Sequence, residues 1–250
     1  MARRERIEFD GHGGGRLAGL LELPDGAPRA SVLFAHCFTC GKDLASASRV
    51  ARALVARGFA VLRFDFTGLG GSDGDFANTN FSSNVQDLLA AAAHLAGRDL
   101  APAVLVGHSL GGTAVLAAAH ELPGVRAVAT IGAPADARHV AAQFGADLAR
   151  IEADGEAEVS LAGRAFTIRR QFLEDIARSS TAALPRLKAA LLVLHAPLDE
   201  TVSIDEASRI FVAAKHPKSF VALDGADHLL TRPGDAAWVA EVIAAWASTW

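Results

Sequence analysis

Short apolar runs that alternate with amphipathic helical patterns constrain the fold of this chain most strongly. The runs are bounded by turn signals and cover residues 31–36, 59–65, 103–108, 125–132, 190–195 and 219–225. Runs that are apolar at every position are typical of strands buried on both faces of a parallel sheet. A strand followed by a helix, repeated along the chain, requires crossovers that place helices on both sides of the sheet. We therefore expect an α/β fold with a mostly parallel central sheet.

The helical patterns carry start and stop signals of their own. Residues 47–55 share an apolar face, and Gly58 follows as a stop. The next pattern covers 85–95, and Ser83 stands three residues before Gln86, which predicts a capping box. We also expect helices near Ser109 and over 235–249, and an antiparallel edge hairpin over 5–9 and 16–22.

The regular alternation breaks between residues 134 and 186. A helical piece over 136–150 is followed by "VSLAGRAFTI", which predicts two short strands around Ala162-Gly163, and then by a second helix. About 50 residues between two core strands are too many for a plain crossover. We therefore expect residues 1–250 to form a single α/β domain with an inserted cap at about 134–186.

Charge and hydropathy exclude several classes of partner. The net charge is −4, and basic residues are scattered apart from short groups at 3–6 and 169–170, so we expect no nucleic-acid partner. The N-terminus lacks the apolar region of a signal peptide, and no stretch approaches the roughly 18 apolar residues of a membrane span. We expect a cytoplasmic protein without a membrane partner. A homodimer, and whether the chain is part of a longer fusion, are left open.

The strongest chemical signal is "VLVGHSLGG", residues 104–112. It contains G-x-S-x-G between a predicted strand and a predicted helix, which is the context of a nucleophile elbow. The sharp turn strains the serine, so the residues two before and two after it must be small. Asp199 and His228 follow in that order, each in a loop after a late strand. This order of serine, acid and histidine predicts a triad of Ser109, Asp199 and His228.

Several segments resemble one known family. The motifs "HCFTCGKD", "RFDFTGLGGSDGDF", "GHSLGG", "IGAPAD", "FTIRRQFLEDI" and "DGADHLL" are similar to the hydrolase half of bacterial proteins that fuse an α/β-hydrolase to an OsmC-like domain. The whole chain resembles α/β-hydrolases of the serine esterase and peptidase type. Its cap more loosely resembles the insert of feruloyl and cinnamoyl esterases. We expect no second domain here because the last helix runs to Trp250, although the resemblance implies a link to an OsmC-like domain in relatives.

An esterase mechanism also needs two donors for the oxyanion. One is expected to be the backbone N–H of Leu110, directly after the nucleophile. The resemblance implies that the loop after "SVLFAH" supplies the other, which matches Phe38 N–H. Relatives usually carry glycine before this donor, whereas this chain has Cys37, so a conformation that only glycine tolerates is in doubt.

The pair Cys37-x-x-Cys40 has the spacing of a redox site. A helix N-terminus just after Cys40 favours a reactive thiolate, but a thioredoxin-type domain explains neither the elbow nor the triad. We therefore expect two cysteines that pack in a loop of a protein from a reducing cytosol. A lone C-x-x-C also lacks the second ligand pair of a zinc site, and the nine histidines form no H-x-x-x-H pair, so no metal is expected.

Two further sets of residues have competing interpretations. The stretch "DFTGLGGSDGD" has Asp73 where a dinucleotide-binding motif needs a third glycine, so Asp65 is expected to hold a tight turn. Candidate residues for the substrate pocket, which are also explained by local packing, are Cys37, His108, His139, Phe144, Phe166 and Phe172.

The function predicted from the sequence is a serine hydrolase that cleaves small carboxylic esters through an acyl-enzyme. We expect acyl chains of short or medium length, or an aromatic acid, and no cofactor. Two alternatives remain: a non-catalytic module that binds a ligand or partner in the capped pocket, and an accessory to a thiol peroxidase.

Overall fold

A mostly parallel sheet forms the centre of the computed structural model, which describes residues 2–161 and 163–250. Within these residues eight strands pair in the order β1-β2-β4-β3-β5-β6-β9-β10. The β1–β2 hairpin is antiparallel and lies at one edge, β2 pairs antiparallel with β4, and the remaining neighbours are parallel. The predicted α/β fold and its edge hairpin are therefore confirmed. The strands are β1 (Arg3–Asp10), β2 (Arg16–Leu23), β3 (Ala30–Ala35), β4 (Phe59–Phe64), β5 (Pro102–His108), β6 (Ala127–Ile131), β9 (Ala190–His195) and β10 (Lys218–Ala222).

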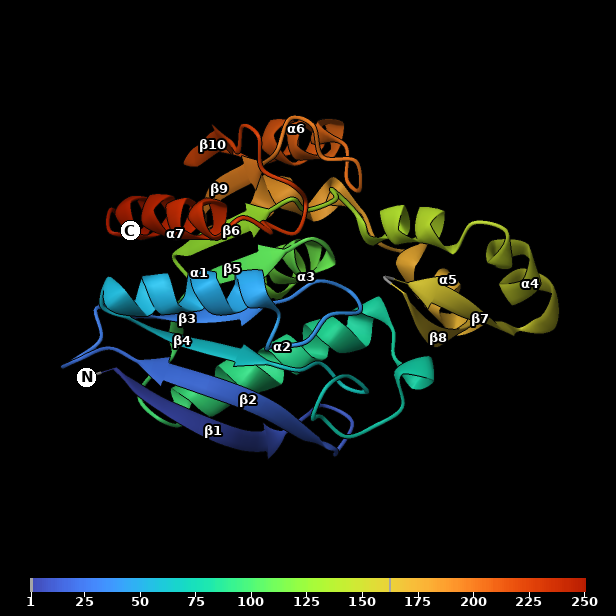
Figure 1. The fold of residues 1–250 in the computed structure, drawn as a ribbon, viewed down its shortest axis with the longest axis horizontal. Helices are drawn as coiled ribbons and strands as arrows, with labels where there is room; N and C mark the ends of the chain where they lie inside the picture. Colours follow the sequence, from blue (N-terminus) through green and yellow to red (C-terminus); the bar gives the residue numbers. More distant parts are fainter. Residues whose placement is uncertain (1, 162) are drawn as a thin grey trace.

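The central strands are apolar at most positions because each face of the sheet builds a separate core. Leu105 of β5 packs into one core, while its neighbours Val104 and Val106 pack into the other. Side chains on a strand point alternately to opposite faces, so a strand covered on both sides needs apolar residues throughout. The helices that cover the first face are α2 (Phe81–Ala96), α3 (Leu110–Ala118) and α6 (Ile204–Ala213), and those on the second are α1 (Ala45–Ala56) and α7 (Pro233–Ala247), which lie side by side in Figure 1.

The helix boundaries confirm some predicted signals and correct others. Gly58 has φ of 88° just after α1, as a C-terminal stop requires. The capping box predicted from Ser83 and Gln86 is wrong, because α2 already begins at Phe81. Ser83 instead accepts a hydrogen bond from the Asn80 N–H at 2.8 Å. Helix α6 was not predicted, since its buried face is short.

The segment between β6 and β9, called the insert below (residues 134–186), lies beyond the carboxyl ends of the parallel strands (Figure 1). The prediction of a single helical piece over 136–150 is wrong, because Gly145, with φ of 52°, divides it. The predicted pair of strands is present as an antiparallel pair, although Ala162 lies outside the described residues. The insert contains η2 (Ala137–Phe144), α4 (Asp147–Asp154), β7 (Glu156–Leu161), β8 (Arg164–Arg169), α5 (Arg170–Ile176) and η3 (Thr181–Arg186), and η1 (Phe76–Asn78) lies outside it.

None of the helices in the described parts of the chain has the length and apolar character needed to cross a membrane.

Candidate active site

Ser109 occupies a strained turn between β5 and α3. Its φ is 54° and its ψ is −130°, an unusual conformation for a residue with a side chain. Glycines make the close approach around it feasible. A Cβ on Gly107 would lie 2.3 Å from the Gly111 carbonyl oxygen, and one on Gly111 would lie 2.3 Å from the His36 carbonyl oxygen. The predicted need for small residues on both sides of the serine is therefore confirmed.

Ser109, His228 and Asp199 form one chain of hydrogen bonds. The Ser109 Oγ lies 3.1 Å from the His228 Nε2, and the His228 Nδ1 lies 2.7 Å from the Asp199 Oδ2. A carboxylate only accepts, so Nδ1–H donates to Asp199 and leaves Nε2 free to accept from the serine hydroxyl. The three predicted residues, far apart in sequence, thus meet in the arrangement that a nucleophile, base and acid require.

The Asp199 carboxylate is held by its own loop as well as by the imidazole. Its Oδ1 accepts hydrogen bonds from the Thr201 and Val202 N–H groups, both at 2.9 Å. Burial on its own raises the pKa of Asp199, but hydrogen bonds from His228 and these N–H groups outweigh burial and lower that pKa below its ordinary value. Asp199 is therefore ionised at neutral pH, as a partner for a charged imidazole must be.

The backbone N–H groups of Phe38, in the loop after β3, and of Leu110, directly after Ser109, have no hydrogen-bond partner within residues 2–161 and 163–250. The peptide group between Cys37 and Phe38 is held by hydrogen bonds to its carbonyl oxygen. The Cys37 carbonyl accepts from the His36 Nδ1 at 2.8 Å and from the Cys40 N–H at 3.2 Å. Cys37 needs no glycine-like conformation, because the described non-glycine residues with positive φ are Asp99, Ser109 and Leu230.

Residues 26–154, just over half of the chain, match the family described as serine aminopeptidase, S33. The chain belongs to this α/β-hydrolase family. The hydrolase is 47% identical to the esterase domain of a Rhodothermus marinus protein, with a TM-score of 0.80 over 98% of each chain.

Lower identities show the hydrolase fold alone. Est1E from Butyrivibrio proteoclasticus with bound ferulic acid is 21% identical, with a TM-score of 0.85 over 97% of this chain and 98% of that one. The mouse α/β hydrolase domain-containing protein 10 is 22% identical, with a TM-score of 0.79 over 98% and 99% of the two chains. No curated protein matches the hydrolase sequence.

The two cysteines of the hydrolase form a disulfide that encloses Phe38. The expectation of two separate thiols packed in the loop is therefore wrong. The turn between them, closed by the hydrogen bond from the Cys40 N–H to the Cys37 carbonyl, brings their Cα atoms to 5.3 Å, within the usual range for a disulfide. Sequence spacing alone does not determine this turn.

The candidate pocket residues lie in two different settings. His108 is buried with its Nε2 2.7 Å from the His228 carbonyl oxygen, and the His139 Nε2 lies 3.1 Å from the Thr201 carbonyl oxygen in the acid loop. The candidate phenylalanines instead belong to an aromatic cluster, in which each ring contacts Phe38 directly or through one other ring. Its members are Phe38, Phe76, Phe144, Phe166 and Phe172.

The aromatic cluster joins the insert to the oxyanion loop. The Phe172 ring lies 5.1 Å from that of Phe38, between ring centroids, and Phe144 lies 6.5 Å from Phe38. Arg164 adds a polar contact, since its Nη1 donates to the Thr39 carbonyl at 3.2 Å. The insert is therefore packed against the loop that contains Phe38.

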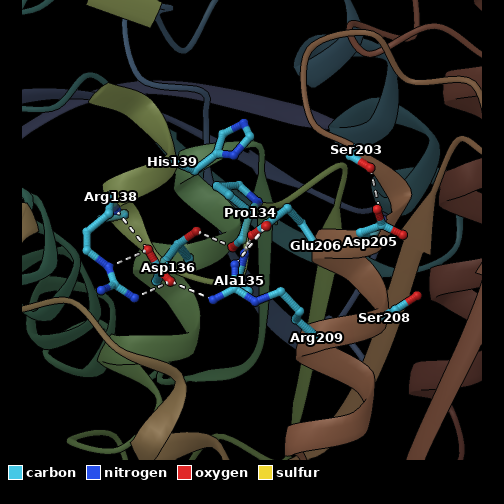
Figure 2. A network of polar contacts seen from close by, with 12 residues as sticks. Pro134, Ala135, Asp136, Arg138, His139, Ser203, Asp205, Glu206, Ser208 and Arg209 are labelled. Carbon is cyan, nitrogen blue, oxygen red and sulfur yellow. Dashed lines mark hydrogen bonds and ion pairs between the residues drawn. The ribbon is translucent and has the colours of Figure 1, made fainter. Parts of the chain in front are cut away.

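The first residues of the insert are tied to α6 by a polar network that the sequence did not indicate. Figure 2 shows Arg138 and Arg209 reaching the Asp136 carboxylate from opposite sides, with the shortest contact at 2.9 Å for each arginine. Glu206 accepts a hydrogen bond from the Ala135 N–H at 2.8 Å. Because α6 follows the loop of the catalytic-acid candidate, the network connects the insert to that side of the site.

Asp65 holds a turn, as the sequence predicted, and lies apart from the serine–histidine–aspartate chain. Its carboxylate accepts from the Lys42 N–H at 2.6 Å, the Lys42 Nζ at 2.9 Å and the Gly71 N–H at 2.9 Å. A Cβ on Gly70, which has φ of 54°, would lie 2.2 Å from Asp65 Oδ2.

In the described residues no group of three or more His, Cys, Asp or Glu side chains is arranged to hold a metal ion.

Proposed function

We propose that this α/β hydrolase is a serine esterase that cleaves small carboxylic esters, with a short or medium acyl chain or an aromatic acid. One observation carries the proposal. The structure combines the hydrogen-bonded chain of Ser109, His228 and Asp199 with unpaired N–H groups at Leu110, directly after the nucleophile, and at Phe38. The related esterase domain supports ester substrates, and Est1E with ferulic acid bound supports an aromatic acid.

In this mechanism Ser109 Oγ attacks the acyl carbonyl while His228 Nε2 takes its proton. Asp199 stabilises the imidazolium through the Nδ1–H. The carbonyl oxygen becomes an oxyanion, which accepts hydrogen bonds from the N–H groups of Phe38 and Leu110. The Leu110 donor lies in the first turn of α3, where the helix dipole adds further stabilisation.

The tetrahedral intermediate then breaks its bond to the alcohol. His228 returns the proton to the departing alkoxide, and the acyl group stays on Ser109 as an ester. A water molecule attacks this ester while His228 Nε2 takes a proton from the water. The second intermediate then breaks its bond to Ser109 Oγ, His228 returns the proton to that oxygen, and the carboxylic acid is released. These steps require neither a metal ion nor a cofactor.

The proposal also assigns a role to the insert. Residues 134–186 act as a cap of a single domain, and the aromatic cluster offers the acyl group an apolar surface beside the oxyanion donors. The substrate is a small molecule, and the hydrolysis occurs in the cytoplasm without a nucleic-acid or membrane partner. Attachment to an OsmC-like domain stays a prediction from the resemblance.

The test compares the unmodified protein with Ser109→Ala on p-nitrophenyl esters from acetate to octanoate, methyl ferulate and an amino-acid p-nitroanilide. We expect turnover of esters to fall by roughly 10⁴-fold or more in the variant, as loss of a nucleophile does in other serine hydrolases. A pre-steady-state burst of p-nitrophenol would report the acyl-enzyme.

Labelling by a fluorophosphonate provides an independent control. The unmodified protein should react at Ser109, and His228→Ala should lose that reaction while keeping its circular dichroism spectrum. Equal rates for Ser109→Ala and the unmodified protein, with no labelling of either, would overturn the proposal and favour a binding module. Faster cleavage of the p-nitroanilide than of every ester would replace the esterase with a peptidase.

A further inference from the structure

His108 lies directly before the nucleophile and has no role in the reaction steps described above. It is the last residue of β5 and is buried, with 4% of its surface exposed. Its ring lies 5.1 Å from the ring of His228, between centroids, at an interplanar angle of 38°. A buried polar side chain beside the general base requires an explanation, because burial without a partner is costly.

The partner of His108 is the backbone of His228 itself. The His108 Nε2 lies 2.7 Å from the His228 carbonyl oxygen, and since a carbonyl only accepts, Nε2 carries the proton. Burial, and next the charge of nearby His228, lower the pKa of His108 to about 4. At neutral pH the ring is therefore uncharged, and its single N–H donates to this carbonyl.

This hydrogen bond connects the base to the strand end that carries the nucleophile. Ser109 and His228 are 119 positions apart in sequence, yet their reacting atoms must stay within 3.1 Å. The backbone hydrogen bonds within the loop of His228 are local, such as Leu230 N–H to the Asp227 carbonyl at 3.1 Å, and Leu229 is 41% exposed. Arg49 Nη1 donates to the Thr231 carbonyl at 3.1 Å, but this contact is exposed. The bond from His108 is thus a buried attachment between this loop and β5.

The same arrangement recurs at two other strand ends. His195 is the last residue of β9, and its Nε2 lies 2.8 Å from the Val202 carbonyl oxygen in the loop that holds Asp199. The His36 Nδ1, after β3, lies 2.8 Å from the Cys37 carbonyl oxygen in the loop that holds the Phe38 donor. A buried histidine therefore fixes a carbonyl in each of the three loops that bring groups to Ser109.

We propose that His108 is a positioning residue. By donating a hydrogen bond to the His228 carbonyl, it holds the imidazole of His228 within hydrogen-bond distance of both Ser109 and Asp199. The inference rests on the proposed serine mechanism. It deepens that mechanism, because a displacement of the base by about 1 Å is expected to cost on the order of 100-fold in rate.

A matched pair of variants tests the donor. His108→Leu removes it at similar volume, whereas His108→Gln restores an N–H at similar reach. We expect kcat for a p-nitrophenyl ester to fall about 10- to 100-fold in His108→Leu with KM changed little, and to recover largely in His108→Gln. His120→Leu, in the turn after α3 and outside the site, controls for the loss of a histidine.

Proton NMR of the free protein gives a second readout that needs no turnover. The low-field resonance of the His228 Nδ1–H, which reports its hydrogen bond to Asp199, should broaden or shift in His108→Leu and return in His108→Gln. In the unmodified protein, ¹⁵N shifts should show His108 neutral with the proton on Nε2 from pH 6 to 8, whether or not His108→Leu folds.

The outcomes separate this inference from the esterase proposal. If the unmodified protein is no faster than Ser109→Ala, the esterase proposal fails, and the positioning role of His108 fails with it. If the enzyme is active, three results would each overturn the positioning role alone: full kcat in folded His108→Leu, equal losses in the Leu and Gln variants, or a His108 ring protonated on Nδ1.

Discussion

Asp65 and Asp199 illustrate how differently two buried carboxylates can be used in one molecule. Both accept several hydrogen bonds, and in both these bonds outweigh burial and lower the pKa of the carboxyl. Asp199 directs one oxygen to an imidazole, whereas the Asp65 carboxylate, among the described residues, accepts hydrogen bonds from Lys42 and from the turn at Gly71. The direction of the pKa shift is the same for both residues and does not separate them. The hydrogen-bond partner does, because only Asp199 of the two is paired with an imidazole.

The lowered pKa of Asp65 predicts a pH-dependent contribution to stability. A carboxyl whose pKa is lower in the folded state stabilises the fold above its unfolded pKa and loses that effect as the pH falls through its folded pKa. We expect Asp65→Asn to reduce the free energy of unfolding at pH 7 by about 3 kcal/mol. Urea unfolding at pH 7 and pH 3 should show this difference shrinking at the lower pH.

Asp43→Asn is the matched control, because the Asp43 carboxylate also contacts the Lys42 Nζ, at 3.0 Å, but is 74% exposed. An exposed pair contributes under about 1 kcal/mol, so Asp43→Asn should be nearly neutral at both pH values. A loss in Asp65→Asn that is the same at pH 7 and pH 3 would contradict the electrostatic account.

Among single residues, Ser109, Asp199 and His228 could be predicted because the motif around the serine and the order of the three residues are both read directly from the sequence. The hydrogen bonds of His108 and the Asp136 network were not indicated. The donor and acceptor in the former are 120 positions apart, and the pairing depends on how loops fold over the strand ends.

At the scale of elements, the loop after β3 combines a disulfide with a candidate oxyanion donor. The bond between Cys37 and Cys40 closes a ring that includes the Phe38 peptide. A dithiol reductant is oxidised as it converts this disulfide to two thiols. We expect the opened ring to misplace the Phe38 N–H and so to lower kcat to about one tenth. Initial rates should be measured alongside a count of free thiols.

The variant that replaces both cysteines by serine provides the control for this loop. It should have the lower rate from the start and should not respond to the reductant. Full activity in protein shown to contain two free thiols would mean that hydrogen bonds to the Cys37 carbonyl hold the donor without the cross-link.

Elements with long apolar patterns were predicted well, and short elements were not. Most positions of the parallel strands are apolar, so their pattern can be recognised without tertiary information. Helix α6 spans only Ile204–Ala213, and its buried face rests on Ala207 and Ile210. The break at Gly145 and the turn that forms the disulfide depend on local backbone conformation, which composition does not specify.

At the scale of the whole molecule, the insert and the sheet domain share one core. Phe172 is 2% exposed and packs against Phe38 and Phe144. We expect Phe172→Ala to lower the free energy of unfolding by about 3 to 5 kcal/mol through the cavity it leaves. Phe220→Ala, at a ring that is 40% exposed, should cost much less. Equal losses in the two variants, measured by urea unfolding, would contradict a shared core.

The aromatic cluster also limits how this enzyme could be re-engineered or diversify. A cap attached only by its two ends could be exchanged between homologues as a module. Here the insert contributes Phe144, Phe166 and Phe172 to a cluster whose other members, Phe38 and Phe76, come from the sheet domain. A transplanted cap would have to bring matching partners at positions 38 and 76. Changes of specificity are therefore expected to need coordinated substitutions on both sides of this contact.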